Sequence, residues 1–335
     1  MIIKSIKLFN FRNHVEYSLL CQDNTSLILG ENGSGKTSVL EAIYILTRGK
    51  SFRAVDSDII RRNADFYRIE LEYSNGEFCT ATYDNFNKTF IVARKKYRRL
   101  PAKHKYPVVL FQPSDLNLFS HSPSSRRDYF DRIFSQFNDS YTSILSKYEK
   151  ALKQRNELLK SDYTTKYALF SWNILLAKYG TDLFSYRQKF IQEINNNITK
   201  VYRSIANNDD VISIIYKTNI NSADDNAYLG ALEASYTKDS YLGHTSFGIH
   251  RDDYIFNFND QPASGSASRG ESRSIILALK FIEADLIQQK TNLKPIILLD
   301  DVFSELDPTR RRCLVKNFKN HQVIITSVED ITKNK

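Results

Sequence analysis

The sequence predicts an α/β fold that is interrupted by a second, mainly helical lobe. Three observations support this: strand-like segments fill most of residues 1–120, a glycine-rich pattern joins a strand to a helix among them, and the apolar spacing then becomes helical, as in Phe130, Ile133, Phe134 and Phe137. We therefore expect one α/β domain formed by residues 1–120 and 245–335, with residues 121–244 as a helical insertion. The segments expected as strands include 67–73, 78–83, 90–92, 108–111 and 211–216.

The glycine-rich pattern is a phosphate loop of the form G-x-x-x-x-G-K-[ST]. An apolar strand is predicted before it at 27–29 and a helix after it at 38–46, so backbone N–H groups can surround phosphates at the positive end of that helix. Lys36 is expected to reach the terminal phosphates and Thr37 to bind Mg²⁺. The predicted nucleotide-binding residues are Gly30, Glu31, Asn32, Gly33, Ser34, Gly35, Lys36 and Thr37.

A strand near the C-terminus supplies the carboxylates that such a site needs. Residues 295–299 are apolar and are followed by Asp300 and Asp301, at the strand end where ligands bind in open α/β sheets. Asp300 is suited to hold Mg²⁺, and Asp301 to orient or deprotonate the attacking water. An ordinary strand with an acidic turn is the alternative. Together with the phosphate loop, the pattern favours ATP and Mg²⁺ as cofactors, with Lys36, Asp300 and Asp301 as catalytic residues.

Two further segments resemble motifs of ABC-type ATPases. Ser268 and Gly270 precede apolar residues at helical spacing, which predicts that both lie at a helix N-terminus where an anion can bind. This segment resembles the signature motif, which completes a nucleotide site on a partner subunit. Residues 302–307, ending in Asp307, resemble the D-loop that crosses that interface. The resemblance implies an ABC-type P-loop ATPase head, with mixed sheets and flanking helices, that dimerises on ATP.

The spacing of these motifs narrows the family. The stretch between Lys36 and Ser268 is longer than a transporter ATPase usually needs and far shorter than a long coiled-coil arm, and no C-x-x-C zinc hook is present. The chain resembles the RecF family of DNA replication and repair ATPases along nearly its whole length. The matching segments are 11–13, 30–37, 51–53, 112–116, 122–123, 126–127, 130–131, 152–156, 248–253 and 300–307.

This resemblance implies roles for further residues. Arg12 is placed against the nucleotide phosphates, and a surface arginine is its alternative. Gln112 corresponds to the glutamine that faces Mg²⁺ and water. The strand 322–327 ends without a histidine, so Thr326 or Ser327 is a candidate sensor of the γ-phosphate. The role of His250, within a matching motif, is left open, with a structural histidine as the simpler interpretation.

The function implied by the resemblance is ATP-dependent binding to DNA during repair, replication and the SOS response. Such a protein would dimerise on ATP at gapped or single-stranded to double-stranded junctions, hydrolyse ATP slowly with stimulation by DNA, and act with RecR and RecO to help load RecA. Two alternatives remain. One is an SMC-like or nuclease-associated ATPase head, and the other is a DNA-independent metabolic or transport P-loop enzyme.

Composition agrees with a folded protein that binds polyanions. The chain has 335 residues, 41% of them hydrophobic, which is enough for two packed lobes. Its 47 Lys and Arg against 38 Asp and Glu leave a net charge of +9. No run of 18 apolar residues predicts a membrane span, and three cysteines lack metal or disulfide spacing, so we expect a cytoplasmic protein without a membrane partner.

The densest basic cluster is a candidate DNA contact. Its side chains would bind backbone phosphates, so binding would be sensitive to salt and nearly independent of sequence. A solvated, charged hairpin accounts for the same pattern. Arg126, Arg127 and Arg155 in the helical lobe are alternative contacts, unless they form ion pairs between domains. The residues of the cluster are Arg94, Lys95, Lys96, Arg98 and Arg99.

Overall fold

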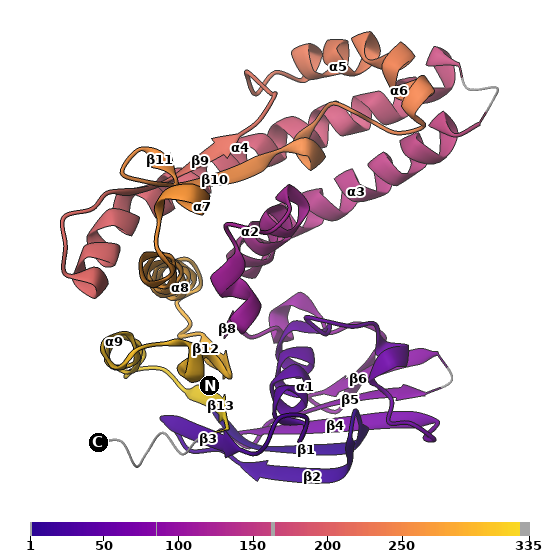
Figure 1. Ribbon diagram of the computed structural model, residues 1–335. Coiled ribbons are helices and arrows are strands. Elements are labelled where there is room, and N and C mark those ends of the chain that lie inside the picture. Colours follow the sequence, from indigo (N-terminus) through magenta and orange to yellow (C-terminus); the bar gives the residue numbers. More distant parts are fainter. Residues whose placement is uncertain (1, 85, 162–164, 329–335) are drawn as a thin grey trace. The chain divides into compact units, whose positions relative to one another are not determined.

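The computed structural model describes residues 2–84, 86–161 and 165–328 (Figure 1). It divides into two compact units, and each is described by itself. The first unit comprises Met1–Leu116 and Glu283–Lys335, and the second comprises Asn117–Ile282. The chain thus leaves the first unit and later returns to it.

The first unit contains a parallel sheet and an antiparallel sheet. The parallel sheet has the order β3-β13-β12-β8, and its two central strands are buried throughout, as apolar strands of parallel sheets are. The antiparallel sheet has the order β2-β1-β4-β5-β6-β7. The parallel strands are β3 (Thr25–Leu29), β8 (Val108–Phe111), β12 (Ile296–Asp300) and β13 (Val323–Ser327). The antiparallel strands are β1 (Ile3–Phe11), β2 (His14–Leu20), β4 (Phe66–Tyr73), β5 (Phe78–Asp84), β6 (Asn87–Val92) and β7 (Lys95–Tyr97).

Helix α1 (Lys36–Arg48) packs against strands of both sheets, and nearly all of its residues are buried. A helix that is buried on every side belongs to the core, and the main apolar cluster of this unit joins α1 to both sheets. The predicted helix at 38–46 is therefore confirmed. The remaining helices of this unit are η1 (Asp56–Ile59), η2 (Ala102–His104), η5 (Val302–Glu305) and α9 (Pro308–Asn317).

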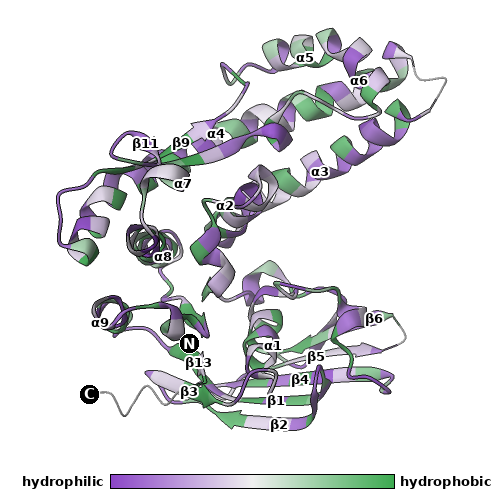
Figure 2. Cartoon of the chain, viewed as in Figure 1, coloured by the Kyte–Doolittle hydropathy of each residue, from purple (hydrophilic) through white to green (hydrophobic). Residues whose placement is uncertain are grey.

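The second unit is mainly helical and contains one small antiparallel sheet. Helices α3 and α4 pack on each other, and Figure 2 shows hydrophobic and hydrophilic residues alternating along both, as expected for helices with one buried face. The helices are α2 (Pro123–Phe137), α3 (Asp139–Leu159), α4 (Lys166–Ala206), α5 (Asp225–Ala234), α6 (Tyr236–Leu242), η4 (Ile249–Arg251) and α7 (Ala263–Ser266). Helix η3 (Pro113–Asn117) ends at the start of this unit, and α8 (Arg269–Thr291) begins in it and ends in the first unit. The strands are β9 (Ile212–Lys217), β10 (Asp253–Phe258) and β11 (Gln261–Pro262), in the order β11-β10-β9.

Side chains of α4 close the open edge of this sheet. Asn195 exchanges two hydrogen bonds of 2.8 Å with the backbone of Ile214, and Thr199 exchanges two with Ile212. These bonds satisfy backbone groups that an edge strand would otherwise leave free for association.

The second boundary between the units lies later than the sequence indicates. We expected the α/β part to resume at residue 245, but residues 245–282 pack within the second unit. The reason is strand pairing, because β10 pairs along its whole length with β9, which also contacts α4. The predicted functional division, which groups Ser268 with the phosphate loop, concerns activity and stays a prediction.

No helix in the described part of the chain combines the length and apolar composition needed to span a bilayer.

Candidate nucleotide-binding site

The phosphate loop of residues 30–37 lies between β3 and the start of α1. Gly33 and Gly35 have φ angles of 84° and 95°, a conformation that favours glycine. A Cβ atom on Gly35 would also lie 2.4 Å from Nε2 of His14, whereas one on Gly33 would meet nothing within 4 Å. No described side chain caps the first turn of α1, so the N–H groups of Lys36 and Thr37 remain available to an anion, whereas that of Ser38 donates to the carbonyl oxygen of Gly35.

The side chain of Lys36 folds back over this loop and is only 6% exposed. Its Nζ donates to the carbonyl oxygens of Gly30 at 2.8 Å and Glu31 at 3.1 Å, and it lies 3.5 Å from Oδ2 of Asp301. The ammonium is thus held between the loop and a carboxylate, where it can meet phosphate oxygens bound by the loop.

The two predicted carboxylates lie beside the loop because β12 ends there. The hydroxyl of Thr37 donates to Oδ1 of Asp300 at 2.7 Å. Thr326, at the end of β13, donates to the same oxygen at 3.0 Å and accepts from the N–H of Asp301 at 2.9 Å. Burial raises the pKa of Asp300, although the hydrogen bonds from both threonines act in the opposite direction. Thr326 is fully buried, so its hydroxyl positions the carboxylates and is not free to sense a phosphate.

These oxygen atoms fit a divalent cation. Carboxylate and hydroxyl oxygens such as those of Asp300 and Thr37 are the ligands that Mg²⁺ prefers. Oδ1 of Asp301 is buried and has no hydrogen-bond partner among the described residues. A buried acceptor without a partner is costly, and a water molecule or bound group in the site would satisfy it.

The turn between β1 and β2 holds the loop from the other side. Nδ2 of Asn13 donates to the carbonyl oxygen of Gly33 at 2.7 Å, and Nε2 of His14 lies 3.2 Å from that of Gly35. A carbonyl oxygen only accepts, so Nε2 of His14 carries the proton. Asn13 lies in a motif that the sequence singles out, whereas nothing in the sequence marks His14.

A pocket of about 560 Å³ lies over the loop and is lined by three cations and two carboxylates. This balance suits a ligand with several negative charges. Arg12, predicted to contact phosphates, lies in its wall and donates two hydrogen bonds to Glu41, at 2.9 and 2.7 Å. The charged lining residues are Arg12, Lys36, Arg53, Asp58 and Asp301.

Comparison with known proteins decides the family. Residues 2–335 match the family model described as the RecF/RecN/SMC N terminal domain. The chain is 34% identical to the DNA replication and repair protein RecF of Clostridioides difficile (strain 630), over 98% of this chain and 92% of that protein. The chain belongs to the RecF family. A RecF of Agathobacter rectalis (strain ATCC 33656 / DSM 3377 / JCM 17463 / KCTC 5835 / VPI 0990) is 33% identical over 100% of this chain and 95% of its own length.

Solved structures of RecF share the fold. One, described as the recombination mediator protein RecF-ATP in the RecFOR pathway, has a TM-score of 0.88 and 28% identity over 98% of this chain and 92% of that chain. Another, described as RecF-ATPrS, gives the same TM-score and identity and covers 93% of that chain. The predicted ABC-type ATPase head, with mixed sheets and flanking helices, is confirmed, and a metabolic or transport P-loop enzyme is set aside.

Two other residues predicted for the nucleotide site of this RecF-family chain lie in its first unit. Gln112 follows β8, and its side-chain amide makes no hydrogen bond to a described residue. Asp307 caps α9, where Oδ1 accepts from the N–H groups of Thr309 at 3.0 Å and Arg310 at 3.1 Å. The cap gives Asp307 a local structural role, and its contact with a partner subunit stays a prediction.

Ser268 and Gly270, of the predicted signature motif, belong to the second unit. Ser268 is exposed just before α8 and forms a capping box with Glu271: its Oγ accepts from the N–H of Glu271 at 3.3 Å, and its own N–H donates to Oε2 of Glu271 at 2.7 Å. The hydroxyl proton of Ser268 is not used by this cap. The predicted position at a helix N-terminus is therefore correct, and the role in a partner's site stays a prediction.

The predicted basic cluster forms the exposed hairpin of β6 and β7. Its cations are exposed, and none of them forms an ion pair with another described residue. Ala93 and Arg94, in the turn, have φ angles of 49° and 62°, although neither is glycine. The cluster consists of Arg94, Lys95, Lys96, Arg98 and Arg99, which we call the basic hairpin.

The three arginines offered as alternative DNA contacts already have partners, all of them in the second unit. Arg126 forms two hydrogen bonds to Asp253, at 2.7 and 2.8 Å. Arg127 donates to the carbonyl oxygen of Asp252 at 2.7 Å. Arg155 has no exposed surface and is paired with a buried aspartate. These three arginines are poor candidates for binding DNA.

His250 has a structural role that the sequence left open. Its Nε2 lies 3.0 Å from the carbonyl oxygen of Thr245, so this nitrogen carries the proton and Nδ1 accepts from the hydroxyl of Tyr148 at 2.8 Å. The Tyr148 oxygen lies 3.1 Å from that of Tyr228, which accepts from the N–H of Ile249. In this series of hydrogen bonds, every proton has an acceptor only when the imidazole of His250 is neutral. Burial, with smaller effects of nearby arginines, lowers the pKa of His250 to about 4.

We expect this histidine to make folding sensitive to mild acid. The unfolded histidine titrates near pH 6.5, so between that value and about pH 4 the unfolded chain binds the extra proton, and stability falls as pH decreases. Lowering the pH from about 6.5 to about 5 should reduce the free energy of unfolding of the parent by about 1.6 kcal/mol, a loss that a His250→Gln variant does not share. Urea unfolding at both pH values measures the difference, and parallel losses in the two proteins would contradict it.

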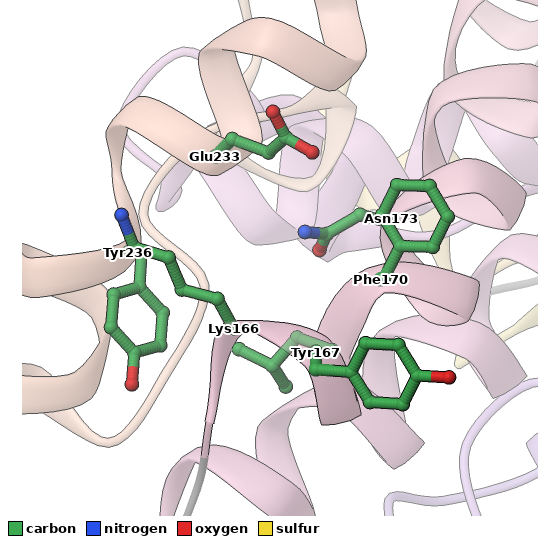
Figure 3. Close-up of a pocket in the computed structure, with 7 residues that line it drawn as sticks. Lys166, Tyr167, Phe170, Asn173, Glu233 and Tyr236 are labelled. Carbon is green, nitrogen blue, oxygen red and sulfur yellow. The ribbon is translucent and has the colours of Figure 1, made fainter.

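A second pocket, of about 340 Å³, lies in the second unit at the start of α4 (Figure 3). Its polar groups include Asn173 and Glu233, and the ammonium of Lys166 lies 5.5 Å from the ring centre of Tyr236. It has neither a glycine loop nor paired carboxylates, so it does not compete with the first pocket as a nucleotide site.

Proposed function

We propose that this RecF-family chain binds ATP with Mg²⁺ at the loop of residues 30–37 and hydrolyses it slowly. The hydrogen bond of 2.7 Å between Thr37 and Asp300 carries the proposal, because it joins the phosphate loop to the carboxylates from a distant part of the sequence. The solved relative described as RecF-ATP supports ATP as the ligand.

Each group has a defined task in this proposal. The loop N–H groups and Lys36 bind the phosphates, and Thr37 and Asp300 hold the cation. Asp301 orients the attacking water and accepts its proton. Bound Mg²⁺ neutralises the charge that develops on the phosphates.

We further propose that ATP closes a homodimer at gapped or junction DNA, with Ser268, Gly270 and Asp307 completing the partner's site. Hydrolysis, stimulated by DNA, then releases the dimer. RecO and RecR are the proposed partners, with RecA acting downstream. The descriptions of the two similar structures mention the RecFOR pathway, which supports this assignment.

Sedimentation tests the proposal as a whole. The mass of the sedimenting protein should double when ATP and Mg²⁺ are added. More duplex DNA should sediment with the protein at low salt than at high salt. A monomer under saturating ATP, with an ATPase rate that ignores DNA, would instead favour a self-contained enzyme.

Replacing Lys36 by alanine removes a charge-assisted contact worth about 1.5–3 kcal/mol, so we expect ATP to bind about tenfold more weakly or worse. A nucleotide titration measures this, with thermal unfolding as the check on folding. Unchanged affinity in a folded variant would rule out the phosphate-loop assignment.

The basic hairpin is our proposed DNA contact, because its cations are exposed and form no ion pair with another described residue. Replacing Arg94, Lys95 and Lys96 by alanine should weaken duplex binding irrespective of sequence and reduce the slope of log affinity against log salt by about 2–3. The matched control replaces Lys150, Lys153 and Lys200, which are also exposed and lie in the second unit. An equal effect of the control would show a general response to lost charge.

A further inference from the structure

Glu41, on α1, is a fully buried carboxylate that bonds two arginines of the wall of the nucleotide pocket. Its Oε1 accepts from Nη2 of Arg12 at 2.7 Å and from the hydroxyl of Ser51 at 2.6 Å. Its Oε2 accepts from Nε of Arg12 at 2.9 Å and from Nε of Arg53 at 3.0 Å. A buried charge is costly unless it is paired in this way.

The hydrogen bonds keep this carboxylate ionised. Burial alone would raise the pKa of Glu41, but the bonds from Arg12, Arg53 and Ser51 outweigh burial and lower it. One negative charge therefore faces two positive charges, and the cluster keeps one positive charge for a ligand.

The two guanidinium groups, unlike the carboxylate, are open to the pocket. The side chain of Arg12 is 20% exposed and that of Arg53 is 35% exposed, and both line the pocket with Lys36. Nη1 of Arg53 makes no hydrogen bond to a described residue. Nη1 of Arg12 also donates to the carbonyl oxygen of Asp58 at 2.9 Å, so its guanidinium is held at three nitrogens. A planar guanidinium whose orientation is fixed and that keeps a free nitrogen, as Arg53 does, suits phosphate oxygens.

We propose that Glu41 is a positioning residue that holds Arg12 and Arg53 side by side as an anion-binding wall for the nucleotide phosphates. The inference rests on the proposed ATPase function. Under this proposal, Glu41 influences ATP binding and hydrolysis only by positioning the two arginines.

The sign of the effect separates this proposal from simple charge balance. Replacing Glu41 by glutamine keeps the volume and removes one negative charge. If Glu41 only offset charge, the pocket would become more positive and ATP would bind more tightly. If it positions the arginines, the glutamine N–H₂ group faces a guanidinium donor, one arginine is displaced, and ATP binding and turnover both weaken.

The test measures ATP binding and steady-state hydrolysis by the full chain for the parent, Glu41→Gln, Arg53→Ala and the double variant. We expect Glu41→Gln to lower kcat/KM about tenfold or more, and the double variant to lie within about threefold of the weaker single variant. Tighter ATP binding by Glu41→Gln, or losses that multiply in the double variant, would overturn the proposal.

Two substitutions keep the test valid if Glu41→Gln does not fold. Arg53→Lys keeps the charge but loses the planar fork, and Ser51→Ala removes one bond to Glu41 without changing any charge. Both should lower kcat/KM, Arg53→Lys more strongly, and parental values for both would also overturn the proposal.

Glu72→Gln is the matched control. It makes the same chemical change in a carboxylate that bonds Lys4 and Ser5 outside the pocket, and it should leave hydrolysis unchanged. If the parent itself neither binds nor hydrolyses ATP, the proposed function fails. If the parent does both and Glu41→Gln matches it, only the role of Glu41 fails.

Discussion

Replacing Asp301 by asparagine should slow ATP hydrolysis about a hundredfold or more while ATP remains bound. Asp301 follows β12 in the left-handed conformation, with a φ angle of 50°, which turns the chain at the edge of the pocket. One of its oxygens is 3.5 Å from Nζ of Lys36, and the other is buried without a described partner. An amide cannot accept a proton from water as a carboxylate does.

ATP binding by the Asp301→Asn variant should not weaken as hydrolysis does. The negative charge of Asp301 repels phosphates, so its removal should leave ATP affinity equal or higher, with Thr37 and Asp300 still holding the cation. Single-turnover hydrolysis beside a nucleotide titration separates the two effects. Asp285→Asn, outside the pocket, is the control for a lost aspartate. Parental turnover in the Asp301→Asn protein would show that another group serves as the base.

Replacing Ser268 by arginine should abolish ATP-dependent dimerisation while each subunit still binds ATP. The serine is exposed at the start of α8, and its hydroxyl proton is free to donate to a phosphate held by another subunit. Arginine there fills the interface and removes the cap, which costs about 1 kcal/mol of helix stability. Gly30 and Lys36 of the same chain are unchanged, so the nucleotide titration should be normal.

Light scattering with and without ATP measures the loss, and thermal unfolding shows whether the missing cap has a wider effect. A mixture of Ser268→Arg with Lys36→Ala protein should recover at most one complete site per dimer. Normal dimerisation of the Ser268→Arg protein would remove the shared-site mechanism and leave a self-contained ATPase.

The phosphate loop is a feature that short segments of the sequence predict correctly. Gly33 and Gly35 have the positive φ angles that the pattern requires, and the predicted strand and helix flank them. These backbone angles and elements depend on residues that are close in sequence, so periodicity and the placement of glycine predict them. Ser268 at its helix start follows the same rule, since its capping partner Glu271 is three residues away.

Other features depend on residues that are distant in sequence. Thr326 bonds Asp300 because β12 and β13 pair in parallel with these two residues in register. The sequence offers Thr326 or Ser327 as the sensor of the γ-phosphate, and nothing in the segment 322–327 shows that the Thr326 hydroxyl contacts a neighbouring strand. The meeting of Glu41 with Arg12 and Arg53 likewise depends on how α1 packs against the chain around it.

The phosphate loop and the strand that carries Asp300 and Asp301 can be predicted from the sequence, because each is a short segment whose geometry is local. The ATPase head and the RecF family are indicated by the resemblance of these motifs and their order. Tertiary contacts were needed to show that Thr326 supports Asp300 and Asp301, that His250 is a neutral structural residue, and that residues 245–282 pack with the helical lobe. These outcomes follow from strand register and burial, which join side chains that no local pattern connects.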